Sequence, residues 1–198
     1  MIKFIVLSTF LFVAGDLWSQ TTKGTPRPSV GVRYQWTEGE ELREAWLDEA
    51  RLAEWGEDEA RSTELRQRRA QLQRQQGHLR IWRLPQRNAR SQMGQLRAQG
   101  HANLAAVFRT GPDESFSPQV LTGHLMVFFP TDWTLKSILD WAQRHRLEHV
   151  EALAFGKNGH RFRAPSAGAE LLDLLSEIQR AGEVKLAAPE WWQDRRAR

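Results

Sequence analysis

The chain has 198 residues, of which 40% are hydrophobic and 26% are charged, and it contains no cysteine. This composition is typical of a globular protein, and it excludes disulfides, thiol catalysis and thiolate metal sites. The net charge of +4 comes from 28 basic residues interspersed with 24 acidic ones. Such a balance favours a mixed, solvated surface over a dedicated nucleic-acid footprint.

The first residues have the pattern of a secretory signal peptide. A charged start is followed by a mainly apolar run at 4–14, and small residues suitable for cleavage follow at Gly15 and Ser19. The run is shorter than the ~20 apolar residues that span a bilayer comfortably. We therefore expect a signal peptide at 1–19, a linker at 20–31, export to the periplasm or beyond, and no stable membrane anchoring. A membrane anchor is the alternative.

Residues 32–110 predict a small N-terminal α+β region. Residues 32–37 alternate in the manner of a strand, and a hairpin return at 43–47 is favoured, although residues 42–55 also fit a helix. Residues 57–76 hold strong helix formers after an acidic start, which predicts a long polar helix ended by the glycine that follows. The other elements expected here are a strand at 79–84, a helix at 88–98 and a strand at 104–108.

Residues 118–192 give a sharper pattern. The expected elements are a strand at 125–129, a helix at 134–145, strands at 149–155 and 160–164, a helix at 169–180 and a strand at 184–188. This β-α-β-β-α-β order predicts a ferredoxin-like antiparallel sheet with two helices on one face, in an α+β protein. The other face of the sheet would be open to a partner.

The two halves of the chain also resemble each other. A strand ending in proline at 81–85, a helix, and an apolar strand at 104–108 have a counterpart at 162–165, a helix, and 186–190. Repetition of one supersecondary unit is the sequence signature of a duplication. We state an internal duplication as a hypothesis.

No group of residues predicts catalysis. His145 and His149 have i, i+4 spacing, but they straddle the expected end of a helix and have no evident third ligand. Ser166 lies in a Pro-Ser-Ala-Gly turn without the nucleophile-elbow pattern, and 156–159 is typical of a hairpin turn rather than a phosphate loop. We expect no enzyme activity, no metal and no cofactor. Strands of this fold can stack nucleic-acid bases, but the RNA-binding strand motif is missing, so no nucleic-acid partner is expected.

The strand at 121–129 and the closing segment Val-Lys-Leu-Ala-Ala-Pro-Glu-Trp at 184–191 resemble the N-terminal pro-domain of subtilisin-like serine proteases. The last strand of that family commonly has the pattern Val-x-x-Ala-x-Pro, followed by Asn or Asp and an aromatic residue. The resemblance covers about residues 102–192. The sequence departs from the family pattern at Lys185, Ala188 and Glu190.

The resemblance implies a chaperone that assists the folding of a subtilisin- or kexin-like serine protease and then inhibits it. The sheet would pack on two surface helices of the enzyme, and an extended tail at 193–198 would occupy the substrate cleft. The residues implied to bind the protease are Pro189, Glu190, Trp191, Trp192, Arg195, Arg196, Ala197 and Arg198.

The sequence contains none of the segments of a subtilase catalytic triad, so the chain resembles a free-standing pro-domain. Its role would be similar to that of the separate chaperone of the Aeromonas kexin-like protease, unless it is a truncated pro-region. The Arg-x-x-Arg spacing at 195–198 fits the subsites of kexin-like enzymes, and the alternative is a solvated basic terminus. The alternative function is a secreted interaction module that has no protease partner and uses its aromatic sheet face.

Overall fold

The computed structural model describes residues 31–56, 59–112 and 116–193, with side chains left out at 59–61. The expected signal peptide, most of the expected linker, and Arg195 to Arg198 lie outside these ranges. The strands are β1 (Arg33–Glu38), β2 (Glu41–Trp55), β3 (Gln71–Gln76), β4 (Leu79–Arg83), β5 (Leu104–Arg109), β6 (Pro118–Phe128), β7 (Glu148–Ala152), β8 (Gly159–Arg163) and β9 (Leu186–Gln193). The helices are α1 (Glu59–Gln67), α2 (Ala89–Ala98), α3 (Leu135–Arg144) and α4 (Glu170–Ala181). The expected α+β class is confirmed.

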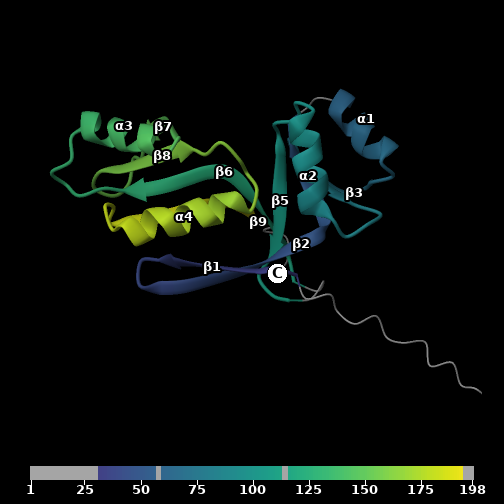
Figure 1. Cartoon of the computed structure of the whole chain (residues 1–198), viewed down its shortest axis with the longest axis horizontal. Helices are drawn as coiled ribbons and strands as arrows, with labels where there is room; N and C mark the ends of the chain where they lie inside the picture. The colour runs from purple at the N-terminus through teal and green to yellow at the C-terminus, as the bar shows by residue number, and fades with distance from the viewer. Residues whose placement is uncertain (1–30, 57–58, 113–115, 194–198) are drawn as a thin grey trace, which may run out of the picture.

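The nine strands of the described residues belong to one curled antiparallel sheet (Figure 1). Its main path is β3-β4-β2-β5-β6-β8-β7, with β1 paired to β2 and β9 paired to β6. Strands from both predicted regions therefore hydrogen-bond within the same sheet, through the β5–β6 pairing. Within the described residues, no helix has the length and apolar character needed to cross a membrane.

The sheet contains two units with the same order of elements. The first unit is β2-α1-β3-β4-α2-β5, with strands side by side as β5-β2-β4-β3. The second unit is β6-α3-β7-β8-α4-β9, with strands side by side as β9-β6-β8-β7. The two sequence segments that resemble each other, β4-α2-β5 and β8-α4-β9, occupy equivalent positions. The topology thus agrees with the hypothesis of an internal duplication.

The long polar helix predicted at 57–76 is wrong. Helix α1 ends at Gln67, Arg69 takes a left-handed conformation with φ of 61°, and the chain then returns as β3. Gly77, with φ of 55°, belongs to the tight turn between β3 and β4 and does not cap a helix. The helix propensity of this glutamine- and arginine-rich segment is overridden because its backbone completes the edge of the sheet beside β4.

Strands β2, β6 and β9 extend well beyond their predicted bounds. Strand β2 runs through all of 42–55, so the helix alternative there is wrong and the hairpin is confirmed. Strand β9 begins at Leu186 and continues to Gln193, well past the predicted end at 188. Proline is tolerated at position 189 because β9 pairs with β6 alone, and an edge strand can leave one side without a donor.

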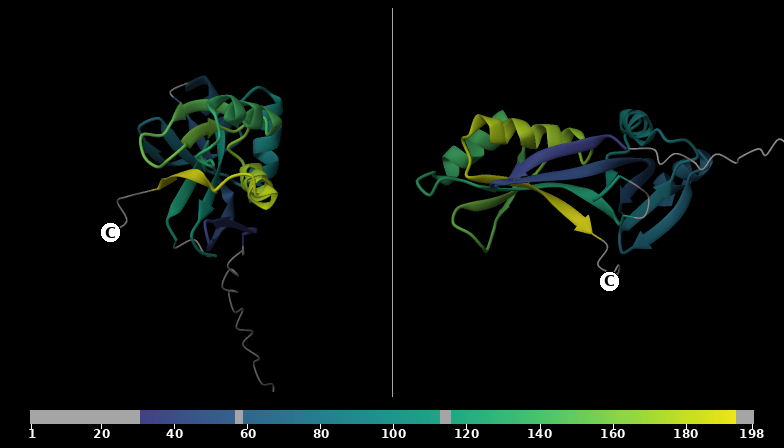
Figure 2. Two further views of the ribbon diagram at one scale, coloured as in Figure 1. Left: turned by 90° about the vertical axis from the view of Figure 1, so that its left-hand side faces the viewer. Right: turned by 90° about the horizontal axis from the view of Figure 1, so that it is seen from below.

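The main core lies between the sheet and all four helices. Leu65 of α1, Leu96 of α2, Trp141 of α3 and Leu175 of α4 all belong to one buried cluster. A smaller apolar cluster lies on the helix-free side of the first unit and includes Val107. In the right-hand view of Figure 2, α3 and α4 lie on one side of the strands of the second unit. One face of that unit therefore has no helix over it.

A bend in β6 separates the directions of the two units. Gly123 has φ of 84°, which favours glycine, and the register of β6 against β9 shifts between Leu121 and Leu125. The half before the bend pairs with β5, and the half after it pairs with β8. In Figure 1 the part of β6 beyond the bend runs crosswise to β5. The bend opens the sheet between β5 and β8 on one side of β6.

Candidate functional site

The helix-free side of the second unit presents a mixed apolar and charged surface. Successive side chains of a strand point to opposite faces, and Leu125, Val127 and Phe162 face the helices in the main core. Their neighbours in β6, β8 and β9 therefore face away. We call this surface the open face. It consists of His124, Met126, Phe128, Arg161, Arg163 and Glu190, with Phe155 of the β7–β8 loop packed against Phe128.

The charges of the open face are arranged around Glu190. The Arg161 guanidinium lies 2.8 Å from Glu190 Oε2 and 3.4 Å from Glu151. The Thr122 hydroxyl donates a hydrogen bond of 3.0 Å to the same Glu190 oxygen. Arg163 pairs with Glu148 at 3.2 Å. Because the cations and carboxylates alternate, this surface suits a partner with its own mixed charges.

His124 is the titratable group nearest this centre. Its Nδ1 lies 3.4 Å from Glu190 Oε2. Burial lowers the pKa of His124 most, the Arg161 cation lowers it further, and the Glu190 carboxylate acts in the opposite direction. An imidazole with a pKa below its ordinary value is neutral at pH 7. The positive charge at the centre of the open face therefore belongs to Arg161.

The apolar part of the open face centres on two phenylalanines. The rings of Phe128 and Phe155 lie 6.2 Å apart, and Phe155 is 59% exposed. Glycines at 156 and 159 allow this packing, since a Cβ at either would come within 2.7 Å of the Phe128 ring. An exposed aromatic ring supported in this way can be buried by a partner at little conformational cost.

Strand β9 contains four of the residues that the sequence implies as protease-binding. Pro189 is buried opposite Leu125, and Trp191 and Trp192 pair with Leu121 and Val120. Glu190 alone among these four joins the open face. The segment Pro189 to Gln193 is therefore part of the sheet, whereas the sequence placed its last residue in an extended tail.

The two tryptophans of β9 pack on opposite sides of the sheet. Trp191 contacts Trp36 and Phe108, with ring centroids 5.7 and 5.4 Å away, on the side of the helices. Trp192 belongs to the small cluster on the other side, and the Arg74 guanidinium lies 5.9 Å from its ring centre. Both rings hold β9 in place. Their contacts within the chain give them a structural role.

A groove of about 700 Å³ continues the open face toward the first unit. It lies at the opening between β5 and β8, where Ala105 and Ala167 form an isolated parallel bridge. Ser166 borders it and accepts a hydrogen bond from Gly168 N, which confirms the expected role of Ser166 in a turn. Arg161 and Arg163 line the groove from the side of the second unit.

The histidine pair noted in the sequence is not brought together. His145 packs on Trp141, with ring centroids 4.6 Å apart, whereas His149 lies 3.0 Å from His160. Burial, followed by the neighbouring His149, lowers the pKa of His160. Across the described ranges, no group of three or more potential ligands could hold a metal ion.

The comparisons with known proteins give little guidance. No family model matches the sequence, and no curated protein matches it significantly. A solved structure assigned as a glycine cleavage system transcriptional repressor is 14% identical, and the alignment covers 73% of this chain and 96% of that one. Its TM-score is 0.25, and at that value the likeness carries no argument.

Proposed function

We propose that the second unit is a ferredoxin-like pro-domain module, and that the protein is an exported, non-enzymatic chaperone and inhibitor of a subtilisin- or kexin-like serine protease. The observation that carries the proposal is the open face, a helix-free sheet surface on a β9-β6-β8-β7 array. The strand order and the two helices on the opposite face support the ferredoxin-like assignment.

The open face has the properties that this function requires. Phe128 and Phe155 offer an apolar centre for burial against the enzyme, and Arg161 and Arg163 lie beside it with their carboxylate partners. A surface that binds the native protease and not its unfolded chain stabilises the native form by mass action. The same affinity makes the chaperone an inhibitor.

The arrangement of β9 gives its residues and residues 194–198 different roles in this proposal. Because Pro189, Trp191 and Trp192 are held within the sheet, they anchor the strand from which the tail leaves. Residues 194–198 are then the part assigned to the substrate cleft, where an extended segment would bind by strand addition. Arg198 would take the primary specificity pocket and Arg195 the fourth subsite.

A secreted interaction module without a protease partner is the second candidate. It is favoured by the open face itself, which offers a complete surface without any contribution from the tail. Binding that depends on the open face and ignores residues 194–198 would separate this candidate from the first.

The test is inhibition and refolding of two purified enzymes, a kexin-like protease that cleaves after basic residues and a subtilisin with apolar specificity. We expect inhibition of at least one enzyme and a higher refolding yield. Phe155→Ser should weaken inhibition about tenfold, since an apolar anchor in an interface typically contributes more than 1 kcal/mol.

Leu135→Ser is the matched control, because Leu135 is similarly exposed, at 55%, but begins α3 on the side of the helices. Deletion of residues 194–198 tests the tail separately. Equal losses from Phe155→Ser and Leu135→Ser would contradict the open face as the docking surface. An absence of inhibition and of refolding with both enzymes would overturn the proposed function.

A further inference from the structure

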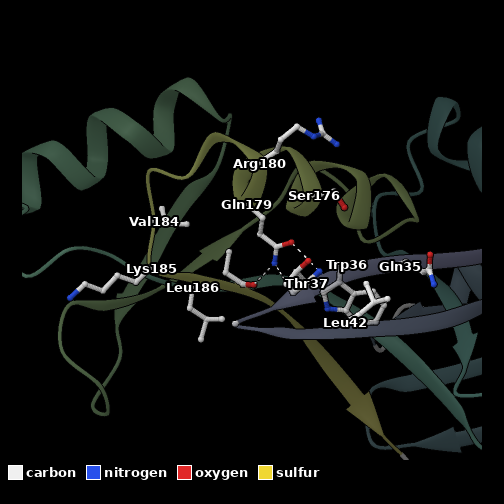
Figure 3. A pocket seen from close by; sticks show the side chains of 12 residues that line it. Gln35, Trp36, Thr37, Leu42, Ser176, Gln179, Arg180, Val184, Lys185 and Leu186 are labelled. Carbon is white, nitrogen blue, oxygen red and sulfur yellow. Dashed lines mark hydrogen bonds between the residues drawn. The ribbon is translucent and has the colours of Figure 1, made fainter.

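A second groove lies away from the open face, between the free edges of β1 and β9 (Figure 3). Its volume is about 440 Å³. Strand β1 forms one wall, and the start of β9 with helix α4 forms the other. Its lining includes Trp36, Thr37, Leu42, Gln179, Lys185 and Leu186.

The groove occupies a gap in an almost closed ring of strands. Neighbouring strands pair in the order β1, β2, β5, β6 and β9, and each of these pairs is antiparallel. Only a pairing between β9 and β1 is missing from the ring. In the described residues, β1 and β9 each have one strand neighbour, so each leaves a backbone edge that another strand could use.

The side chain of Gln179 bridges this gap. Its Oε1 accepts a hydrogen bond of 3.2 Å from Thr37 N, and its Nε2 donates to Thr37 O and, at 3.0 Å, to Ala187 O (Figure 3). A carboxamide has the same donor and acceptor groups as a peptide unit. At one point along the gap, Gln179 therefore makes the hydrogen bonds that a peptide unit of a strand between β1 and β9 would make.

One buried donor beside the gap has no acceptor among the described residues. Trp36 is 6% exposed and lines the groove, and its indole Nε1 has no hydrogen-bond partner in the part of the chain that the structure describes. Buried indole N–H groups usually have a partner, and an unmet one is unfavourable. The other contacts of Trp36, including its packing on Trp191, are apolar. A backbone carbonyl brought into the gap could accept this hydrogen bond.

The lining of the groove is positively charged. Arg180 and Lys185 are its charged residues, and no ion pair joins either of them to another described residue. The acids of the adjoining β1–β2 hairpin lie outside the lining, and two of them, Glu38 and Glu41, pair with Arg43. Leu42, at 67% exposure, adds an apolar contact. The lining thus favours an extended segment with alternating apolar and acidic side chains.

We propose that this groove binds an acidic, extended peptide segment of a partner protein by strand addition between β1 and β9. The peptide displaces the Gln179 carboxamide and pairs with the backbone of Thr37 and Ala187. One of its carbonyls accepts the hydrogen bond of Trp36 Nε1, and its carboxylates lie against Arg180 and Lys185. This site is separate from the open face and does not depend on the proposed protease function.

The test is fluorescence anisotropy with two labelled seven-residue peptides, one of alternating Val and Glu and one of alternating Val and Lys, added to the full chain. We expect the acidic peptide to bind at least tenfold more tightly than the basic one. Gln179→Ala should tighten binding about threefold, because it removes the competing carboxamide. Trp36→Phe keeps an aromatic ring but removes the donor, and it should weaken binding several-fold.

Lys185→Glu should weaken binding of the acidic peptide at least tenfold. Lys157→Glu is the matched control, because Lys157 is an exposed lysine in the β7–β8 turn, remote from the groove in sequence and absent from its lining. Equal binding of both peptides, equal losses in the two lysine variants, or weaker binding by Gln179→Ala would each overturn the proposal. A dimer of the chain that dissociates on Lys185→Glu would also overturn it, by assigning the groove to a second copy.

Discussion

The two units have the same order of elements but use their helix-free faces in opposite ways. In the first unit that face is apolar and buried, with Ile81 and Val107 packed beneath Trp55 and Trp192. In the second unit that face is half-buried to exposed, with charges around Glu190 and two phenylalanine rings at its edge. A shared topology therefore fixes neither the chemistry nor the use of a sheet face.

The helix-side cores differ as well. The first unit buries a carboxylate, since Glu54 is 2% exposed and accepts hydrogen bonds from Trp82 Nε1 at 3.0 Å and Ser62 Oγ at 3.1 Å. The corresponding region of the second unit is largely aromatic, with Trp141 packed edge-on against Phe129 and Phe162. The core of the first unit thus contains a carboxylate with one hydrogen-bonded oxygen, and the core of the second consists mainly of packed rings.

The largest expected effect comes from Trp141→Ala, which leaves a cavity among the rings of the second unit. We expect a loss of about 3–5 kcal/mol in the free energy of unfolding, measured by urea titration. Because the β5–β6 pairing joins the units, far-UV circular dichroism and tryptophan fluorescence should report one shared transition. Two separate transitions, with the first unit unaffected, would show that the units fold independently.

The next effect concerns the buried carboxylate of the first unit. Glu54→Leu removes the acceptor of Trp82 Nε1 and Ser62 Oγ and should lower the free energy of unfolding by about 1–3 kcal/mol. Glu54→Gln keeps an oxygen acceptor and should cost clearly less. Similar losses in the two variants would mean that the charge, and not the acceptor, matters at this position.

Substitution of two arginines compares the core of the first unit with the open face of the second. Arg80 of the first unit has a side chain that is 12% exposed and donates to Gly56 O and Ser62 Oγ. Arg161 of the open face has a side chain that is 29% exposed. We expect Arg80→Ala to cost about 1–2 kcal/mol and Arg161→Ala less than about 1 kcal/mol in thermal or urea unfolding. The reverse order would contradict the assignment of Arg161 to a binding surface.

The helices and strands of the second unit are easier to predict from the sequence than those of the first, for physical reasons. Around Phe162 and Ile138 the apolar periods of strand and helix are regular, so the order of elements could be predicted. The segment at 71–76 could not be predicted, because its glutamines and arginine favour a helix and only pairing with β4 makes it a strand. Pro189 was expected to end β9, whereas the missing partner on one side of that strand accommodates it.

The candidate site was harder to predict than the fold. Glu190 could be singled out by its place in a family-like segment, but its partner Arg161 lies in β8, which is not adjacent to β9. Their contact follows from the way β6 lies between those two strands, and that order is a property of the whole sheet. The only local signal for Arg161 and Arg163 is their alternation with Phe162, which assigns them to the opposite face.

The smallest expected effect is a dependence of stability on pH that arises in the second unit. Burial and the neighbouring His149 lower the pKa of His160, and burial also lowers that of His124. The unfolded chain then binds more protons than the folded one as the pH falls below the ordinary histidine pKa of about 6.5. The contribution is fully present above that pH and is lost as the pH falls through the lower folded values. His160→Gln should flatten the slope of stability between about pH 7 and 5, measured by urea titration at each pH. An unchanged slope in His160→Gln would mean that the acid sensitivity does not come from the His149–His160 pair.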